Sequence, residues 1–329
     1  MVNKIFVSVT NIRGLGAKLL VEKLLDQDLK DFRVIVFQNL KNTLINSNFK
    51  AFYLNKHLLP YELFRIYEIF TLHKIVKKHR YKVFLSLGDI PYYKIKNQVV
   101  LVHNPHIFKS FLKLFFEFSL KVIVNKLIFE LNSKFVDKFI VQTNHMFNKF
   151  IEQYPNLNEK IIVITFPVPI VNYKNQLNKR HTKNIKFFYP ARFYKHKNHK
   201  ILLSITNEFL EKNNFEIVLT IDFDHRYETK FKLIGEIDSN KVKHHYSTSN
   251  VLLFLSLDET FGMPLIEAMS FELLIVCPDL PYAREICGEK AIYFDPSCVN
   301  SLMYAMEEAS KLCILNFKPD YSEIQKKYS

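Results

Sequence analysis

Cysteine and glycine are scarce in this sequence of 329 residues, which contains four of the first and six of the second. The cysteines are Cys277, Cys287, Cys298 and Cys313. None lies in a Cys-x-x-Cys pair, so no zinc or dithiol redox motif is present, and reduced thiols are expected. A dinucleotide fingerprint needs three spaced glycines, but after Gly14 and Gly16 the third position is Leu19. This spacing argues against an NAD-binding site.

Long apolar runs are also lacking. No window approaches the roughly 18 uncharged apolar residues of a transmembrane helix. The first residues run into an alternating strand pattern at Lys4–Val9, without the basic start and apolar stretch of a signal peptide. We therefore expect a cytoplasmic protein. Hydrophobic residues form 48% of the chain and charged residues 24%, which is the composition of a globular enzyme.

Negative charge is deficient in the first half of the chain. The formal net charge is +14, and residues 1–170 carry 25 Lys and Arg against 12 Asp and Glu, whereas residues 171–329 carry 21 against 20. A basic excess confined to one domain indicates a polyanionic surface met by that domain, either nucleic acid or the anionic leaflet of a membrane.

Strand and helix patterns alternate along the chain, which predicts α/β domains with parallel sheets. The length suits two domains. Phe166–Pro169 and the polar segment Asn172–Asn184 suggest the connection between them. We predict a first domain at 1–170, a second at 171–310, and a helical segment at 311–329 that can return to the first domain.

The turn Gly14–Gly16 follows the first predicted strand and precedes a helix. Backbone N–H groups at such a helix start can bind an anion, so this turn is a candidate phosphate or acceptor loop. A turn without a ligand explains the two glycines equally well.

Two glutamates flank a second loop, where residues 256–268 read Ser-Leu-Asp-Glu-Thr-Phe-Gly-Met-Pro-Leu-Ile-Glu-Ala. The pattern places Glu259 after the buried strand Val251–Leu255 and Glu267 one turn into the next helix. Ligands of open α/β sheets bind at this edge. Carboxylates accept charge-assisted hydrogen bonds from vicinal hydroxyls, and the loop's N–H groups suit a phosphate.

This segment resembles the donor-site signature of family 4 retaining glycosyltransferases (glycosyl transferases group 1), including the bacterial enzymes that build O-antigen and other surface polysaccharides. Phe187–Leu203 resembles the strand, Arg and Lys of the same family, with Arg192 and Lys197 in the matching places. The resemblance is strong over about 185–310 and diffuse before it. It implies the GT-B architecture, in which two Rossmann-like parallel-sheet domains face each other across a cleft.

The resemblance also implies roles for these residues. Arg192 and Lys197 would stabilise the diphosphate leaving group of a nucleotide sugar, because fixed cations stabilise developing negative charge. Glu259 would contact the transferred sugar and Glu267 the ribose. The remaining donor-binding candidates are Phe261, Gly262 and Met263, through their backbone N–H groups.

His103 is the candidate catalytic residue of the first domain, together with Glu259 of the second. It ends the strand Val99–His103 beside a proline turn, where the family often has a histidine next to the reacting sugar. A structural histidine is the alternative. Asp222-Phe223-Asp224 has the letters of a metal motif but lacks the rest of a site, so we expect no metal and no cofactor besides the nucleotide sugar.

The expected activity is transfer of a sugar, with retention of configuration, to a lipid-linked saccharide. A helical pattern over 107–135 combines apolar residues with lysines at one basic stripe, Lys109, Lys113, Lys121, Lys126 and Lys134. We expect Lys109, Lys113 and Lys121 to contact anionic lipids at the inner face of the cytoplasmic membrane. A core helix explains the same pattern.

Two other classes of protein fit less well. A nucleic-acid-binding protein would explain the basic charge, but no known nucleic-acid module accompanies it and the aromatic residues have core spacing. A sugar-nucleotide epimerase lacks the third glycine and a suitable Tyr-x-x-x-Lys pair. We expect no nucleic acid partner.

Overall fold

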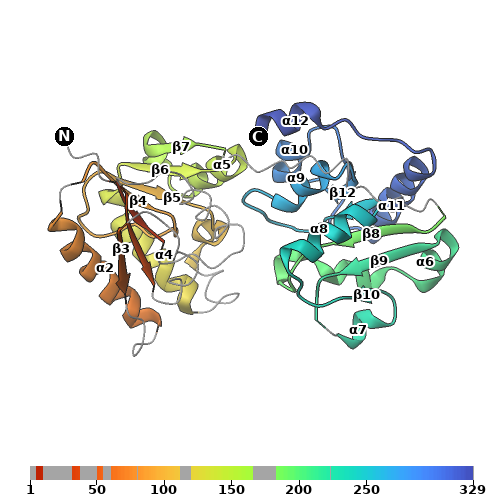
Figure 1. Cartoon of the computed structure of the whole chain (residues 1–329), viewed down its shortest axis with the longest axis horizontal. Helices are drawn as coiled ribbons and strands as arrows, with labels where there is room; N and C mark the ends of the chain where they lie inside the picture. The colour runs from red at the N-terminus through yellow and green to blue at the C-terminus, as the bar shows by residue number, and fades with distance from the viewer. Residues whose placement is uncertain are drawn as a thin grey trace. The chain divides into compact units, whose positions relative to one another are not determined.

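The computed structural model describes residues 5–9, 32–37, 50–54, 61–79, 81–111, 120–165, 183–222 and 224–328. The chain divides into two compact units, 1–165 and 166–329, coloured red to yellow-green and green to blue in Figure 1. The candidate turn Gly14–Gly16 and Lys113 lie outside the described residues, as do residues 166–182 of the predicted connection.

The first unit contains a parallel sheet with the strand order β3-β2-β1-β4-β5-β6-β7. Its strands are β1 (Ile5–Ser8), β2 (Phe32–Phe37), β3 (Lys50–Leu54), β4 (Val83–Ser86), β5 (Gln98–Leu101), β6 (Lys138–Val141) and β7 (Ile161–Val163). Every paired neighbour is parallel. The predicted α/β class is therefore confirmed for this unit, although the edge strand β3 was not predicted.

Helices cover this sheet. They are α2 (Tyr61–Lys77), α4 (Leu120–Asn132) and α5 (Asn144–Gln153), with short 3₁₀ helices η2 (Pro105–Phe108), η3 (Ser133–Phe135) and η4 (Pro155–Lys160). Ile69 and Leu72 of α2 pack with Ile128 of α4 and Phe84 of β4 in one buried cluster. The hydroxyl of Thr143 accepts the backbone N–H of Met146 and caps the start of α5. No described helix is long and apolar enough to cross a membrane.

The structure corrects one part of the predicted basic stripe. Lys126 of α4 is 1% exposed, so it is no surface residue. Its ammonium donates to the Ile107 carbonyl at 2.8 Å and the Tyr154 hydroxyl at 2.8 Å, and lies 3.1 Å from a carboxylate oxygen of Glu130. A buried ammonium needs such partners because the interior does not solvate it. Lys121 is exposed and Lys109 is half-buried.

The second unit contains a parallel sheet with the strand order β10-β9-β8-β11-β12-β13. Its strands are β8 (Ile185–Tyr189), β9 (Phe215–Leu219), β10 (Lys232–Leu233), β11 (Val251–Leu253), β12 (Leu274–Pro278) and β13 (Ile292–Phe294). Its helices are η6 (Lys195–Lys197), η7 (His199–Ser204), α6 (Asn207–Asn213), α7 (His225–Glu228), α8 (Ser239–Thr248), α9 (Met263–Ser270), α10 (Pro281–Cys287), α11 (Val299–Ile314) and α12 (Ser322–Tyr328). The predicted α/β class is therefore confirmed for this unit as well.

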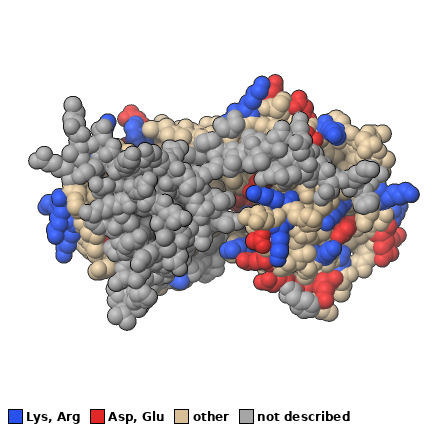
Figure 2. Space-filling view, viewed as in Figure 1, with Lys and Arg blue, Asp and Glu red and all other residues tan. Residues whose placement is uncertain are grey.

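The end of the chain packs on the second unit. The Tyr321 hydroxyl donates to the Leu273 carbonyl at 2.8 Å, and Gln325 of α12 donates to the Met269 carbonyl at 3.0 Å. The return of 311–329 to the first domain stays a prediction. Basic and acidic side chains of this unit are interspersed on the face that Figure 2 shows, which agrees with its balanced charge.

We predict that Lys126→Ala lowers the free energy of unfolding by about 2 kcal/mol, because it removes the buried ammonium that donates to the Ile107 carbonyl and the Tyr154 hydroxyl and pairs with Glu130. Thermal or urea denaturation measures this change. Lys121→Ala, on the exposed side of the same helix, is the control and should stay within about 0.5 kcal/mol of the parent. Equal stability of the two variants would contradict the buried role of Lys126.

Candidate active site

The second sheet has a switch point between β8 and β11. From β8 the chain proceeds outward to β9 and β10, and from β11 it proceeds in the opposite direction to β12 and β13. Loops that leave the carboxyl ends of the two strands diverge at such a point and form a crevice that can hold a ligand. The loop after β8 carries Arg192 and Lys197, and the loop after β11 carries Glu259.

These two loops are joined by hydrogen bonds. The Tyr189 hydroxyl, at the end of β8, donates to the Lys197 carbonyl at 2.6 Å. The backbone N–H of Leu257 donates to the His196 carbonyl at 2.7 Å. Burial raises the pKa of the Tyr189 phenol, so its hydroxyl keeps its proton and remains a donor. The loops are thus held in a fixed register with each other.

Lys197 and Glu259 form an ion pair across the switch point. Their side chains are only 17% and 15% exposed, so solvent screens the pair less than it screens a surface pair. The ammonium also lies 5.9 Å from the ring centre of Phe254. The structure therefore brings together two residues predicted to bind the donor.

The loop between the two glutamates turns at Gly262. Its φ is +68°, and an added Cβ would lie 3.0 Å from Cδ1 of Leu265, so only glycine fits without strain. α9 begins at the next residue, Met263. The Phe261 side chain is 3% exposed and packs on Tyr328. Phe261 can therefore offer a ligand its backbone rather than its ring.

Glu267 lies one turn into α9, as predicted, and is half-buried. Its carboxylate accepts a hydrogen bond from the Tyr246 hydroxyl of α8 at 2.9 Å. Burial raises the pKa of the Glu267 carboxyl, and the Tyr246 hydrogen bond acts against that rise. A carboxylate held in this way can accept further hydrogen bonds from ligand hydroxyls.

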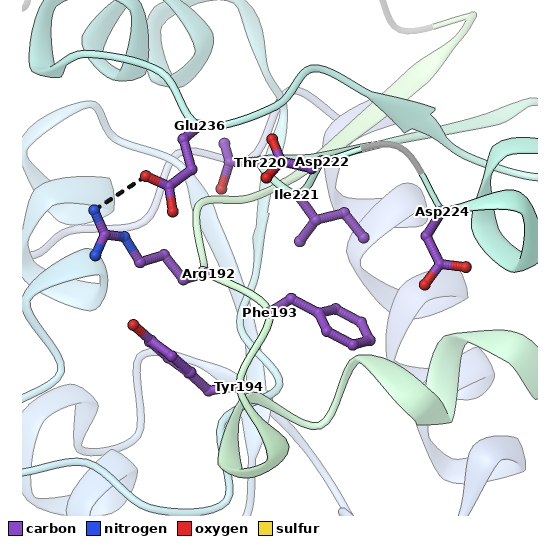
Figure 3. Close-up of a pocket in the computed structure, with 8 residues that line it drawn as sticks. All are labelled: Arg192, Phe193, Tyr194, Thr220, Ile221, Asp222, Asp224 and Glu236. Carbon is purple, nitrogen blue, oxygen red and sulfur yellow. Dashed lines mark hydrogen bonds and ion pairs between the residues drawn. The ribbon is translucent and has the colours of Figure 1, made fainter.

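Arg192 has a different partner from Lys197. It lies 3.1 Å from a carboxylate oxygen of Glu236, and both side chains are more than half exposed. Arg192 and Glu236 line a pocket of about 300 Å³ at the ends of β8, β9 and β10, together with Phe193, Tyr194, Thr220, Ile221, Asp222 and Asp224. Figure 3 shows the Arg192–Glu236 pair at one side of this pocket and Asp224 at the other.

The two rings and Asp222 in this pocket were not identified as site residues from the sequence. Asp224 is bound by the guanidinium of Arg226, at 3.0 and 2.6 Å. Over the part of the chain that the structure describes, no group of three His, Cys, Asp or Glu side chains is placed to hold a metal ion. Metal independence stays a prediction.

In the first unit, His103 lies beyond β5 beside a carboxylate that the sequence did not reveal. Nδ1 of its ring is 3.4 Å from Oδ1 of Asp89, and the same Oδ1 accepts the backbone N–H of His103 at 2.6 Å. Asp89 follows β4, the strand next to β5. Only the pairing of the two strands brings these residues together.

Comparison with known proteins shows which family part of the second unit resembles. Residues 224–314 match the family model described as "Glycosyl transferases group 1". The O-antigen chain mannosyltransferase RfbU of Salmonella typhimurium is 26% identical over 235 residues, which are 66% of this chain and 62% of the relative. The serotype-specific mannosyltransferase WbdA of Escherichia coli is 38% identical over 74 residues, or 22% of this chain and 9% of WbdA.

Solved structures share the whole fold. Anabaena HepE in complex with UDP and glucose has a TM-score of 0.66 at 14% identity, over 99% of this chain and 98% of HepE. WaaG, a glycosyltransferase of lipopolysaccharide biosynthesis, has a TM-score of 0.69 at 11% identity, over 98% of this chain and 94% of WaaG. The predicted family resemblance and GT-B fold class are thereby confirmed. The chain spans less than two thirds of RfbU and a small part of WbdA.

We predict that Gly262→Ala lowers the free energy of unfolding by about 1–2 kcal/mol, since a left-handed conformation is costly for alanine and its Cβ would crowd Leu265. A thermal melt measures the loss. Leu257→Ala is the control, because Leu257 is 44% exposed in the same loop, and it should change little. An unchanged melting temperature in Gly262→Ala would show that the loop does not require this conformation.

Proposed function

Because residues 224–314 match the family model "Glycosyl transferases group 1", we propose that the chain transfers a sugar from a nucleotide-diphosphate sugar to a saccharide acceptor. The observation that carries the proposal is the Lys197–Glu259 pair at the switch point, with Glu267 on the helix that follows. Retention of configuration and independence of metal ions belong to the same proposal. Both rest on the family resemblance.

The ion pair suits a site for a diphosphate next to a sugar. A diphosphate that approaches Lys197 competes with Glu259 for the ammonium, because both are anionic. Glu259 is then available to accept hydrogen bonds from the sugar's hydroxyls. Lys197 meanwhile stabilises the negative charge that develops on the leaving diphosphate as the glycosidic bond breaks. The two residues of this ion pair would thus supply both interactions that donor activation needs, one with the leaving diphosphate and one with the sugar.

We assign the nucleoside part of the donor to the region of the Arg192 pocket and Glu267. The pocket has two aromatic rings, Phe193 and Tyr194, beside charged groups, which is a suitable lining for a flat, polar base. Glu267 would accept hydrogen bonds from the ribose hydroxyls. Arg192 could meet the diphosphate only by exchanging Glu236 for it, which its exposed position permits.

His103 is the proposed catalytic residue of the first unit. Its side chain is 22% exposed, at the same sheet edge as Asp89. The carboxyl edge of a parallel sheet is where ligands bind in this class of fold. We propose that His103 contacts the sugar during transfer.

We further propose that the acceptor is lipid-linked and that the first unit docks on an anionic membrane. α2 carries an unusual surface for this purpose. It buries the paired charges of Arg65 and Glu68 beside its core residues, and it leaves several large apolar side chains exposed. The large apolar residues on the outer faces of α2 and of its neighbour α4 are each between 45% and 68% exposed: Leu63, Ile66, Tyr67, Phe70, Leu120, Leu127 and Leu131.

An exposed apolar face of this kind, on a domain with excess positive charge, fits the interface of an anionic bilayer. Lys121 lies next to Leu120 on α4, and Lys74 and Lys77 lie in the last turn of α2. Apolar residues would enter the headgroup region while the lysines attract the lipid phosphates. This surface differs from the expected stripe in that it excludes Lys126 and includes α2.

We predict that Lys197→Met lowers sugar transfer by about 10²–10³-fold, because it removes a cation directed at the leaving group. Transfer is measured as release of nucleoside diphosphate from UDP-glucose and GDP-mannose. UDP or GDP should raise the melting temperature of the parent and fail to do so in Lys197→Met, whereas duplex DNA and NAD should have no effect on either.

Lys195→Met is the matched control for that experiment, since Lys195 belongs to the same 3₁₀ helix and is exposed. It should retain activity. Glu267→Ala should lose activity as Lys197→Met does. Normal transfer by either Lys197→Met or Glu267→Ala would refute the donor site, and stabilisation by DNA would favour a nucleic-acid-binding protein.

We predict that the protein sediments with vesicles containing phosphatidylserine, little with phosphatidylcholine alone, and is released by high salt. The triple variant Leu63→Ser, Phe70→Ser and Leu131→Ser should bind at least about tenfold more weakly, because three apolar side chains no longer enter the bilayer. Replacing Lys109, Lys113 and Lys121 together by Gln should also weaken binding.

Tyr304→Ser is the control for the apolar variant, because Tyr304 is 68% exposed on α11 of the second unit. It should bind vesicles as the parent does. If the apolar triple variant sediments like the parent, the α2 and α4 faces do not contact lipid. Release of nucleoside diphosphate from the donor should survive in both triple variants, since the donor site belongs to the other unit.

A further inference from the structure

Asp89 lies at the carboxyl edge of the first sheet, where the loop after β4 meets the loop after β5. β1 lies between β2 and β4 in the sheet, so the crevice of this unit forms where the loops after β1 and β4 diverge. Asp89 is in the loop after β4. His103 and Asn104 follow β5, the next strand of the same sheet. The side chains of two adjacent loops therefore meet at this edge.

The Asp89 carboxylate is buried and already bonded. It is 4% exposed, and Oδ1 accepts the backbone N–H groups of His103 at 2.6 Å and of Asn104 at 3.1 Å. Its own backbone has φ +62°, the left-handed region, and its N–H donates to the Leu101 carbonyl at 3.3 Å. Burial raises the pKa of the Asp89 carboxyl, while His103 and the two N–H groups act against that rise.

His103 presents a matching feature. Nδ1 of its ring is buried and has no hydrogen-bond partner, and it lies 3.4 Å from Oδ1 of Asp89. The side chain as a whole is 22% exposed, so part of the ring remains accessible. A small rotation of the ring would bring Nδ1 into hydrogen-bond range of the carboxylate. A protonated Nδ1 could donate a hydrogen bond to the buried carboxylate, which would satisfy both buried groups.

The partner of one imidazole nitrogen determines the state of the other. If Nδ1 carries the proton and faces Asp89, the neutral ring has an unprotonated Nε2 that can accept a hydrogen bond. Nε2 would then accept from a hydroxyl of the sugar. If Nε2 carried the proton, the lone pair of Nδ1 would face a carboxylate, which is repulsive. Asp89 can therefore select the tautomer as well as hold the loop.

We propose that Asp89 is a positioning residue for His103, which fixes the Nδ1–H tautomer and the ring orientation so that Nε2 accepts a hydrogen bond from a sugar hydroxyl. The part that concerns the sugar rests on the proposed glycosyltransferase function. The tautomer and its dependence on Asp89 do not. The two parts can be tested separately.

The first test is ¹⁵N NMR of the full chain labelled at its 12 histidines. The signals that disappear in His103→Ala identify His103. In the parent at neutral pH the ring should be the Nδ1–H tautomer, and in Asp89→Asn the two tautomers should mix. An Nε2–H tautomer in the parent overturns the proposal without any Asp89 variant, as do unchanged ring signals in a folded Asp89→Asn.

The second test is a double-mutant cycle with UDP-glucose and GDP-mannose as probes. Asp89→Asn keeps an oxygen for the two backbone N–H groups, so its melting temperature should stay near that of the parent. Its kcat should fall about 10- to 100-fold with little change in KM, the effect of losing one hydrogen bond to a charged group. In a His103→Ala background the same substitution should cost nothing further.

The outcomes separate the two claims. A loss of kcat that is equally large in the His103→Ala background means that Asp89 only anchors the loop, and the positioning role is wrong. If the tautomer depends on Asp89 but His103→Ala keeps full turnover, the positioning of the ring stands and the proposed role of His103 in transfer fails.

Discussion

The candidate donor site depends on the hydrogen bonds that tie the loop after β8 to the loop after β11. Tyr189 reaches from the end of its strand to the Lys197 carbonyl, and Leu257 donates to His196 in the same stretch. The Tyr282 hydroxyl of α10 donates to the Ser256 carbonyl and so also holds the loop after β11 in place. These donors come from buried side chains and backbone, which do not need a ligand to be ordered. This shared register holds Lys197 and Glu259, which lie on separate loops, close enough to form their ion pair.

Much of this site could be predicted from the sequence because its residues are close along the chain. Glu259, Gly262 and Glu267 lie within one strand, loop and helix start, so their order already gives their placement at a sheet edge. Asp89 and His103 were not associated, since only the pairing of β4 with β5 brings them together. The edge strands β3 and β10 were missed for a related reason. Each pairs with one neighbour, β2 or β9, and β10 is only two residues long, too short to show a strand pattern.

Lysine spacing proved a poor guide to the surface of α4. A lysine every few residues along an apolar helix predicts a basic stripe, yet Lys126 points inward to the Ile107 carbonyl and to Tyr154. Those partners are 19 and 28 residues distant, so no local pattern reveals them. A long amphipathic side chain can satisfy either environment, and the tertiary partner decides between them. Lys121 of the same helix also lies beside apolar residues, yet it is exposed, so the neighbouring sequence does not distinguish the two lysines.

In α2, too, the local sequence does not show which side chains are buried. Here a charged pair lies inside, and several apolar side chains lie outside. Its buried side holds Arg65 and Glu68 among apolar residues such as Leu72. Glu68 also accepts a hydrogen bond from the Tyr92 hydroxyl at 2.8 Å. Burying two charges costs free energy that hydrophobic residues at those positions would not cost. The helix meanwhile leaves Leu63, Ile66 and Phe70 about half exposed. Leaving these apolar side chains in water does not add to the stability of the unit. The proposed contact with a bilayer would give this outer face a second apolar phase to meet. The outward apolar residues would then be explained by that contact, while Arg65 and Glu68 are held inside by each other and by Tyr92.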